Sequence, residues 1–136
     1  MDRLKVLICD DDDFFALTIM CDDTIKHFLK MVHFDTSEFD GIETEIAVNG
    51  LVGMKMYDTR KHHVVFTDYN MPRKNGVELL KHIYQNDFKP FKSFLMSNNF
   101  NIESFEDALF LHKDDIFSAY FENERCKIRG GTNNFN

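Results

Sequence analysis

Short apolar runs alternate along the chain with longer segments in which apolar residues recur three or four positions apart. Runs of the first kind occupy residues 4–9, 44–48, 63–67, 93–96 and 116–119, and each predicts a buried strand. The helical spacing predicts a helix over residues 14–32, further helices after Gly50 and Gly76, and another over residues 102–112. Strands that alternate with helices of this length indicate an α/β chain with a doubly wound, parallel sheet of five strands flanked by helices.

Length and composition are those of one globular domain. The chain has 136 residues, of which 43% are hydrophobic and 29% charged, and we assign residues 1–129 to this domain. Residues 130–136 are rich in glycine and asparagine and are predicted to form a flexible C-terminal tail. The alternative role for this segment is a docking peptide.

Charge and hydropathy narrow the range of partners and compartments. The formal net charge of −7 argues against a nucleic-acid partner, which requires a basic face. No apolar stretch reaches the roughly 18 residues that span a bilayer, so no membrane partner is expected. The chain begins directly with a predicted strand, which indicates no signal peptide, and its three cysteines form no close pair. We therefore expect reduced thiols in a cytoplasmic protein.

Acidic residues follow two of the predicted strands. Asp10 and Asp11 come directly after the first strand, and Asp68 follows the third. Ligands of a parallel α/β sheet bind outside the carboxyl ends of its strands, so three carboxylates converge there if these strands are neighbours. Carboxylates this close repel one another unless a cation separates them, and Mg²⁺ suits a site with few protein ligands. The metal would shield Asp68 while its carboxylate attacks an anionic phosphoryl group. Asp12 and Asp13 have the alternative role of a solvated helix start.

Three segments resemble the receiver domains of two-component response regulators. They are residues 6–12, 64–76 and 94–97, with the sequences VLICDDD, VVFTDYNMPRKNG and FLMS, and the resemblance extends from about residue 4 to residue 121. It implies a flavodoxin-like receiver fold and a phosphoacceptor role for Asp68. It also implies that Asp11 binds Mg²⁺ directly, that Asp10 assists, often through water, and that the backbone carbonyl of Asn70 is a further ligand. Ser97 matches the hydroxyl that moves toward the phosphoryl group.

The resemblance leaves the end of the last strand open, where receiver domains carry a lysine that pairs with the phosphoryl oxygens. Lys113 would leave 15 residues after Ser97 for two loops, a helix and a strand. These elements typically need about 10 residues for the helix, 5 for the strand and 2 for each loop. Ala119 leaves 21 residues, so the spacing favours Ala119 as a replacement for the lysine. The last helix would then be shortened to residues 122–129, and Ile116 would stand at the aromatic switch position three residues earlier. Under the Lys113 alternative the last helix covers residues 114–128.

The sequence thus predicts a phosphoryl-accepting signalling module that is not an enzyme beyond autophosphotransfer and autodephosphorylation. Its expected partners are a histidine kinase or histidine phosphotransfer protein and a downstream protein target. The missing lysine supports an alternative, a degenerate receiver that binds a protein without being phosphorylated. Asp10 and Asp12 also mimic the nucleophile pair of haloacid-dehalogenase phosphatases, but the chain is short for that fold. An EF-hand at residues 10–13 fails because no glycine or closing glutamate stands at loop spacing.

Overall fold

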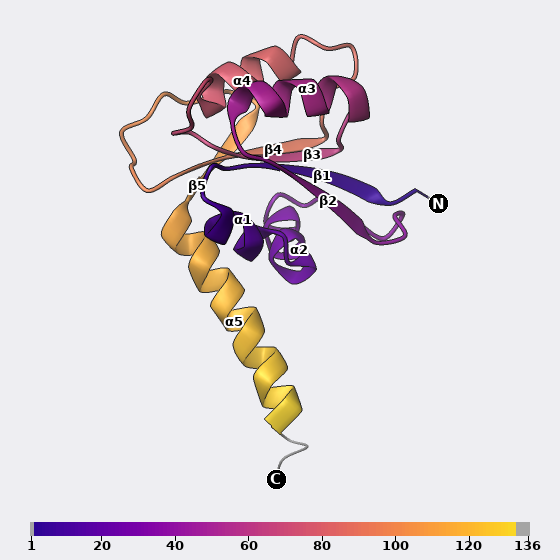
Figure 1. Cartoon of the computed structure of the whole chain (residues 1–136). Helices are drawn as coiled ribbons and strands as arrows, with labels where there is room; N and C mark the ends of the chain where they lie inside the picture. Colours follow the sequence, from indigo (N-terminus) through magenta and orange to yellow (C-terminus); the bar gives the residue numbers. More distant parts are fainter. Residues whose placement is uncertain (1, 133–136) are drawn as a thin grey trace.

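Five strands form one parallel sheet in the computed structural model, which describes residues 2–132 (Figure 1). The strands are β1 (Leu4–Cys9), β2 (Ile42–Ala47), β3 (Val64–Asp68), β4 (Lys92–Ser97) and β5 (Ala108–His112). Their order across the sheet is β2-β1-β3-β4-β5, and every neighbouring pair is parallel. The predicted α/β class with a doubly wound sheet of five strands is confirmed.

Helices cover both faces of this sheet (Figure 1). One face carries α1 (Asp13–Ile19), α2 (Asp22–Met31) and α5 (Lys113–Thr132), and the other carries α3 (Gly50–Arg60) and α4 (Gly76–Ile83). Alternate side chains of β1 enter the two cores, so Ile8 packs under the first set of helices and Leu7 under the second. Burial on both faces explains why β1 and β3 are mostly apolar in the sequence, with Lys5 near the start of β1 as the charged exception.

The first helical segment differs from the prediction, because residues 14–32 do not form one helix. The side chain of Asp12 accepts hydrogen bonds from the backbone N–H groups of Phe14 and Phe15 and so caps α1. The chain then breaks near Cys21, whose backbone is extended, and α2 begins at Asp22. Acidic residues at Asp22 and Asp23 suit the positive end of a new helix dipole, which favours a helix start at this point.

The segment between β4 and β5 differs most from the elements predicted from the sequence. Residues 98–107 are all described and contain no helix, so the helix predicted over residues 102–112 is wrong. The last strand is β5, which ends at His112, and the strand predicted over residues 116–119 is also wrong. Those residues belong to α5, where Ile116 and Ala119 are buried at helical spacing against the core below α1 and α2. The chain connects β4 to β5 without a helix, so β5 ends earlier than the spacing predicted.

The last helix is consequently long rather than shortened. Helix α5 runs from Lys113 to Thr132, and Figure 1 shows its second half extending beyond the rest of the fold. It therefore includes the start of the segment predicted as a tail at residue 130, and residues 133–136 lie outside the described part. None of the helices in residues 2–132 combines the length and hydropathy of a bilayer-spanning segment.

Candidate functional site

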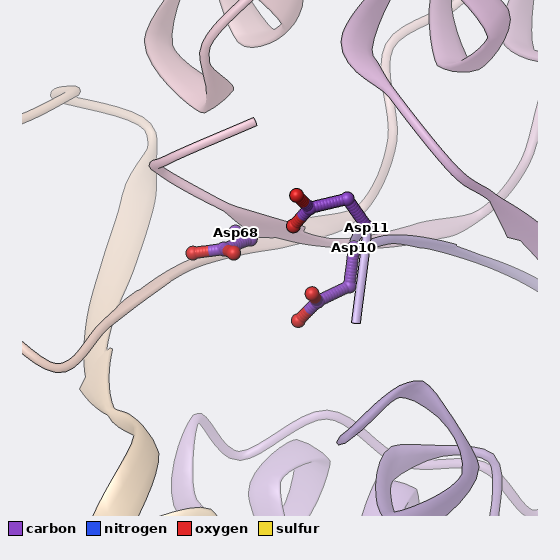
Figure 2. Close-up of side chains that lie close together, drawn as sticks. All are labelled: Asp10, Asp11 and Asp68. Carbon is purple, nitrogen blue, oxygen red and sulfur yellow. The ribbon is translucent and has the colours of Figure 1, made fainter. Parts of the chain in front are cut away.

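Three carboxylates meet at the carboxyl ends of β1 and β3. These strands are neighbours, and the pairing of Cys9 with Thr67 brings the residues that follow, Asp10 and Asp68, to the same edge. The carboxylates of Asp10, Asp11 and Asp68 each offer an oxygen atom within 4.8 Å of the others. Figure 2 shows these side chains gathered at the strand ends. The convergence expected from the sequence is therefore present in the structure.

Two of these carboxylates are buried and hydrogen-bonded to the backbone. Asp10 is fully buried, and its Oδ1 accepts a hydrogen bond of 2.9 Å from the backbone N–H of Asp12. Asp68 is 5% exposed, and its Oδ1 accepts a longer bond of 3.3 Å from the N–H of Asn70. Asp11 is exposed to solvent. The site thus has a buried inner side formed by Asp10 and Asp68 and an open side at Asp11.

Lys113 supplies the positive charge of the site. Its Nζ lies 3.1 Å from Oδ2 of Asp10 and 3.1 Å from Oδ2 of Asp68. The ammonium also lies 4.4 Å from the centre of the Phe15 ring, and little of the lysine is exposed. The preference for Ala119 as the residue at this position is therefore wrong. Ala119 is buried in α5, whereas Lys113 directly follows β5 and reaches the carboxylates.

Burial and charge act in opposite directions on the protonation of these groups. Burial raises the pKa of the Asp10 carboxyl to about 6, and the charge of Asp68 adds to this rise, while Lys113 opposes it. Burial also raises the pKa of Asp68, again against the effect of Lys113. Burial by itself would lower the pKa of Lys113, but the charges of Asp10 and Asp68 raise it overall. The lysine stays charged, and one ammonium faces three carboxylates.

This donor set fits a hard divalent cation. Asp10 Oδ2 is buried, and its contact among the described residues is the ion pair with Lys113 Nζ at 3.1 Å. A buried oxygen that retains coordinating capacity, next to two further carboxylates, is the kind of ligand that Mg²⁺ takes in proteins. The excess of negative charge also favours a cation at the open side near Asp11.

The loop after Asp68 is held closely against the end of β3. The backbone N–H of Gly76 donates to the carbonyl oxygen of Tyr69 at 2.9 Å and closes the loop. A Cβ at Gly76 would overlap the backbone oxygen of Asp68 and come within 2.9 Å of a Leu95 methyl group. The side chain of Asn75 caps α4 in a reciprocal capping box. The Asn-Gly pair marks the predicted helix start in the sequence, whereas the close contact of Gly76 with the backbone of Asp68 is visible only in the structure.

Ser97 ends the strand next to Asp68. Asp68 pairs with Met96 in the sheet, so Ser97 lies one residue beyond the level of the carboxylate and is almost fully buried. Its Oγ accepts a hydrogen bond of 3.0 Å from the backbone N–H of Asn99. In the same loop, the carbonyl oxygen of Asn98 accepts a hydrogen bond of 3.0 Å from Nε2 of His112. Ser97 is thus placed beside the site and tied to the start of the β4–β5 loop.

Comparison with known proteins points to one family. A family model described as the response regulator receiver domain matches residues 6–128. An uncharacterized response regulatory protein of Vibrio vulnificus (strain CMCP6) is 31% identical over 108 residues, which cover 79% of this chain. The aligned part spans only 39% of that relative.

Solved structures show the same fold. The response regulator domain of Thermotoga maritima CheB has a TM-score of 0.59 at 22% identity, with 96% of this chain and 97% of that chain covered. The receiver domain of the putative response regulator NarL from Mycobacterium tuberculosis has a TM-score of 0.57 at 15% identity, with 93% and 97% covered. A structure of the CheX-CheY-BeF₃-Mg²⁺ complex from Borrelia burgdorferi has a TM-score of 0.53 at 16% identity, with 89% of each chain covered. These structures share the fold, and the family match over residues 6–128 shows that the chain belongs to the response regulator receiver domain family.

Proposed function

We propose that this receiver domain accepts a phosphoryl group on Asp68 in a two-component or phosphorelay pathway, and that the transfer depends on Mg²⁺. The observation that carries the proposal is the arrangement around Asp68, which combines two further carboxylates with the ammonium of Lys113 at 3.1 Å. A lone buried carboxylate would repel an anionic phosphoryl group. Here the Lys113 ammonium, together with a cation bound by the carboxylates, can offset the negative charge of that group.

The residues of the chain divide the work of phosphoryl transfer. A carboxylate oxygen of Asp68 forms a bond to phosphorus while the bond from phosphorus to the donor nitrogen breaks, and the electron pair of that bond stays on the donor. Lys113 favours the ionised form of Asp68 that this attack requires, and it can pair with the phosphoryl oxygens afterwards. Asp10, Asp11 and the backbone carbonyl of Asn70 would hold Mg²⁺, which offsets negative charge on the phosphoryl group when bound.

Ser97 and Phe110 are the proposed sensors of the phosphoryl group. Ser97 lies at the end of β4, and its hydroxyl would leave the N–H of Asn99 to reach the phosphoryl oxygens. Since Lys113 is the lysine of the site, the aromatic switch position three residues earlier falls on Phe110 in β5, and the assignment of Ile116 is withdrawn. The Phe110 ring centroid lies 5.7 Å from that of Phe100 on the β4–β5 loop, which links the two segments.

Proteins are the proposed partners upstream and downstream. The family consists of signalling modules rather than classical enzymes, and a CheY of the same fold has been solved with CheX, BeF₃ and Mg²⁺. Phosphoryl donors would be a histidine kinase or a histidine phosphotransfer protein, in the cytoplasm. Exposed apolar side chains at Phe14 and Leu17 on α1, the helix that begins next to the acidic cluster, provide a surface for such a donor.

The alternative of a degenerate, phosphorylation-independent receiver loses its main support. It rested on a missing lysine, and Lys113 occupies the site. The haloacid-dehalogenase alternative is excluded by the receiver fold and by the family match.

Phosphorylation with a small donor tests the proposal. Wild-type protein is incubated with acetyl phosphate, with and without Mg²⁺, and the intact mass and peptide fragments are measured. One phosphoryl group on Asp68 is expected, only with Mg²⁺ present, and none in Asp68→Asn. Asp13→Asn is the matched control, because Asp13 is an exposed carboxylate at the start of α1. Comparable uptake by Asp68→Asn and wild type would contradict the assignment.

A further inference from the structure

The first residue of α3 touches the loop that follows Asp68. Helices α3 and α4 lie side by side on one face of the sheet, and the loop of residues 69–75 leads into α4 (Figure 1). Gly50 opens α3 and is buried. A Cβ at this position would overlap the carbonyl oxygen of Lys74 and come within 2.7 Å of the Lys74 Cβ. Real Cβ atoms essentially never show contacts under 3.0 Å, so the backbones approach closely only because Gly50 has no side chain.

Backbone conformation does not explain the glycine. Gly41 is the glycine with a positive φ among the described residues, and Gly50 lies outside that region. Asn49 caps the helix through its side chain, which accepts a hydrogen bond from the N–H of Val52. An alanine could therefore adopt the backbone angles of Gly50, and steric overlap with Lys74 is the one obstacle that the structure presents.

Lys74 is the far end of a loop that is fixed at several points. At the start, the N–H of Tyr69 donates to the carbonyl of Met96, and at the end Gly76 N–H donates back to Tyr69, both at 2.9 Å. In between, Lys74 N–H donates to the carbonyl of Pro72 at 2.9 Å, in a turn where Arg73 has a φ of 77°. We therefore expect a displacement of Lys74 to shift the other residues of this closed loop, among them Asn70.

We propose that Gly50 is a positioning residue for the metal site, because its missing side chain lets α3 hold the loop so that the Asn70 carbonyl can reach the cation. The inference rests on the Mg²⁺ binding proposed above and extends it to a residue that is remote from the carboxylates. Mg²⁺ demands near-ideal octahedral geometry at about 2.0–2.1 Å, whereas Ca²⁺ accepts about 2.3–2.6 Å and irregular coordination. Displacement of one ligand should therefore weaken Mg²⁺ binding more than Ca²⁺ binding.

The test compares Gly50→Ala with Gly53→Ala, one turn further along the same helix. A Cβ at Gly53 would meet Cys9 Sγ at 2.8 Å and Leu79 methyl groups at 3.3 Å, which are side chains of the buried core, and would not meet Lys74. Dissociation constants for Mg²⁺ and for Ca²⁺ are measured by calorimetry on the full chain. Gly50→Ala should weaken Mg²⁺ binding about tenfold or more, the range found for residues that support metal ligands, with a smaller effect on Ca²⁺. Gly53→Ala should change melting temperature while leaving the ratio of the two affinities unchanged.

Different results would contradict the role of Gly50 and the proposed Mg²⁺ binding. Equal loss of Mg²⁺ and Ca²⁺ affinity in Gly50→Ala, or the same Mg²⁺ loss in Gly53→Ala, would show that the effect is general destabilisation and overturn the inference alone. Absence of Mg²⁺ binding in the wild type would overturn the proposed function as well. If Gly50→Ala does not fold, amide NMR of the wild type decides. The Lys74 and Gly50 signals should shift with the same Mg²⁺ dependence as Asn70, and unshifted signals at these positions would overturn the inference.

Discussion

Replacement of Lys113 by methionine removes the positive charge of the site while keeping a side chain of similar length. The lysine lies 3.1 Å from a carboxylate oxygen of both Asp10 and Asp68, and all three residues are buried. At this distance and an effective dielectric constant of about 20, each attraction is roughly 5 kcal/mol before the cost of burying the ammonium is subtracted. Loss of one partner from a buried ion pair typically costs about 3–5 kcal/mol.

The expected loss depends on pH, because the carboxylates can respond by binding protons. The folded pKa of Asp10, about 6, lies above its ordinary value of 3.8, so its contribution to stability is complete below that ordinary value and is lost as the pH rises through 6. Without Lys113 this pKa rises further. We therefore expect Lys113→Met to lower the free energy of unfolding by about 3 kcal/mol at pH 8 and by clearly less at pH 5.

Urea denaturation without divalent metal, at pH 5 and pH 8, measures this difference. Lys55→Met is the matched control, since Lys55 is exposed on α3, and it should change stability by less than about 0.5 kcal/mol. Lys113→Met should also bind Mg²⁺ more tightly than the wild type, because the ammonium that competes for Asp10 and Asp68 is gone. A loss of stability that is equal at both pH values, together with unchanged Mg²⁺ affinity, would refute the electrostatic reasoning.

Three further predictions follow from the metal site, a buried histidine and the last helix. Mg²⁺ at a hundredfold excess over its dissociation constant should stabilise the fold by about 2.7 kcal/mol in thermal unfolding, and Asp11→Ala should remove most of this shift. Burial lowers the pKa of His62 below its ordinary value of 6.5, although Glu45 opposes this effect. The contribution of neutral His62 to stability is therefore complete above pH 6.5 and is lost as the pH falls. Between pH 7.5 and pH 5 the free energy of unfolding, measured by denaturation, should fall less for His62→Gln than for the wild type. Ala119→Lys should destabilise the domain by about 1–3 kcal/mol because it overfills the core, whereas Ser118→Lys, at an exposed neighbour, should be nearly neutral in the same assay.

The first four strands and the acidic cluster could be predicted from the sequence alone. Strands β1 and β3 lie in the interior of the sheet with helices on both faces, so residues 6–9 and 64–66 are apolar at successive positions, and this pattern is visible in the sequence without the fold. Asp10 and Asp68 interrupt such runs at their carboxyl ends. Because parallel strands present those ends at one edge, local patterns were sufficient to place the carboxylates together.

The end of the chain could not be predicted in this way. Strand β5 is at the edge of the sheet, with Leu109 40% exposed, and residues 108–111 are continuously apolar. Apolar residues over 102–112 also stand at helical spacing, and this spacing predicted a helix in place of the strand. The segment around Ile116 and Ala119 is apolar enough for a strand, and short apolar runs do not distinguish a strand from a buried helix face. This segment forms a helix because helical spacing lets Ile116 and Ala119 pack against α1 and α2.

Tertiary structure alone assigned the lysine and the supporting glycine. Lys113 is separated from Asp68 by 45 positions in the chain and meets it only because β5 ends beside the site. Gly50 meets Lys74 only because α3 and α4 share one face of the sheet. The sequence determined which side chains end the inner strands, since burial on both faces leaves a local pattern. Contacts between distant segments leave no such pattern, because they depend on the length and path of the connections, and here a connection without a helix brought Lys113 to the carboxylates.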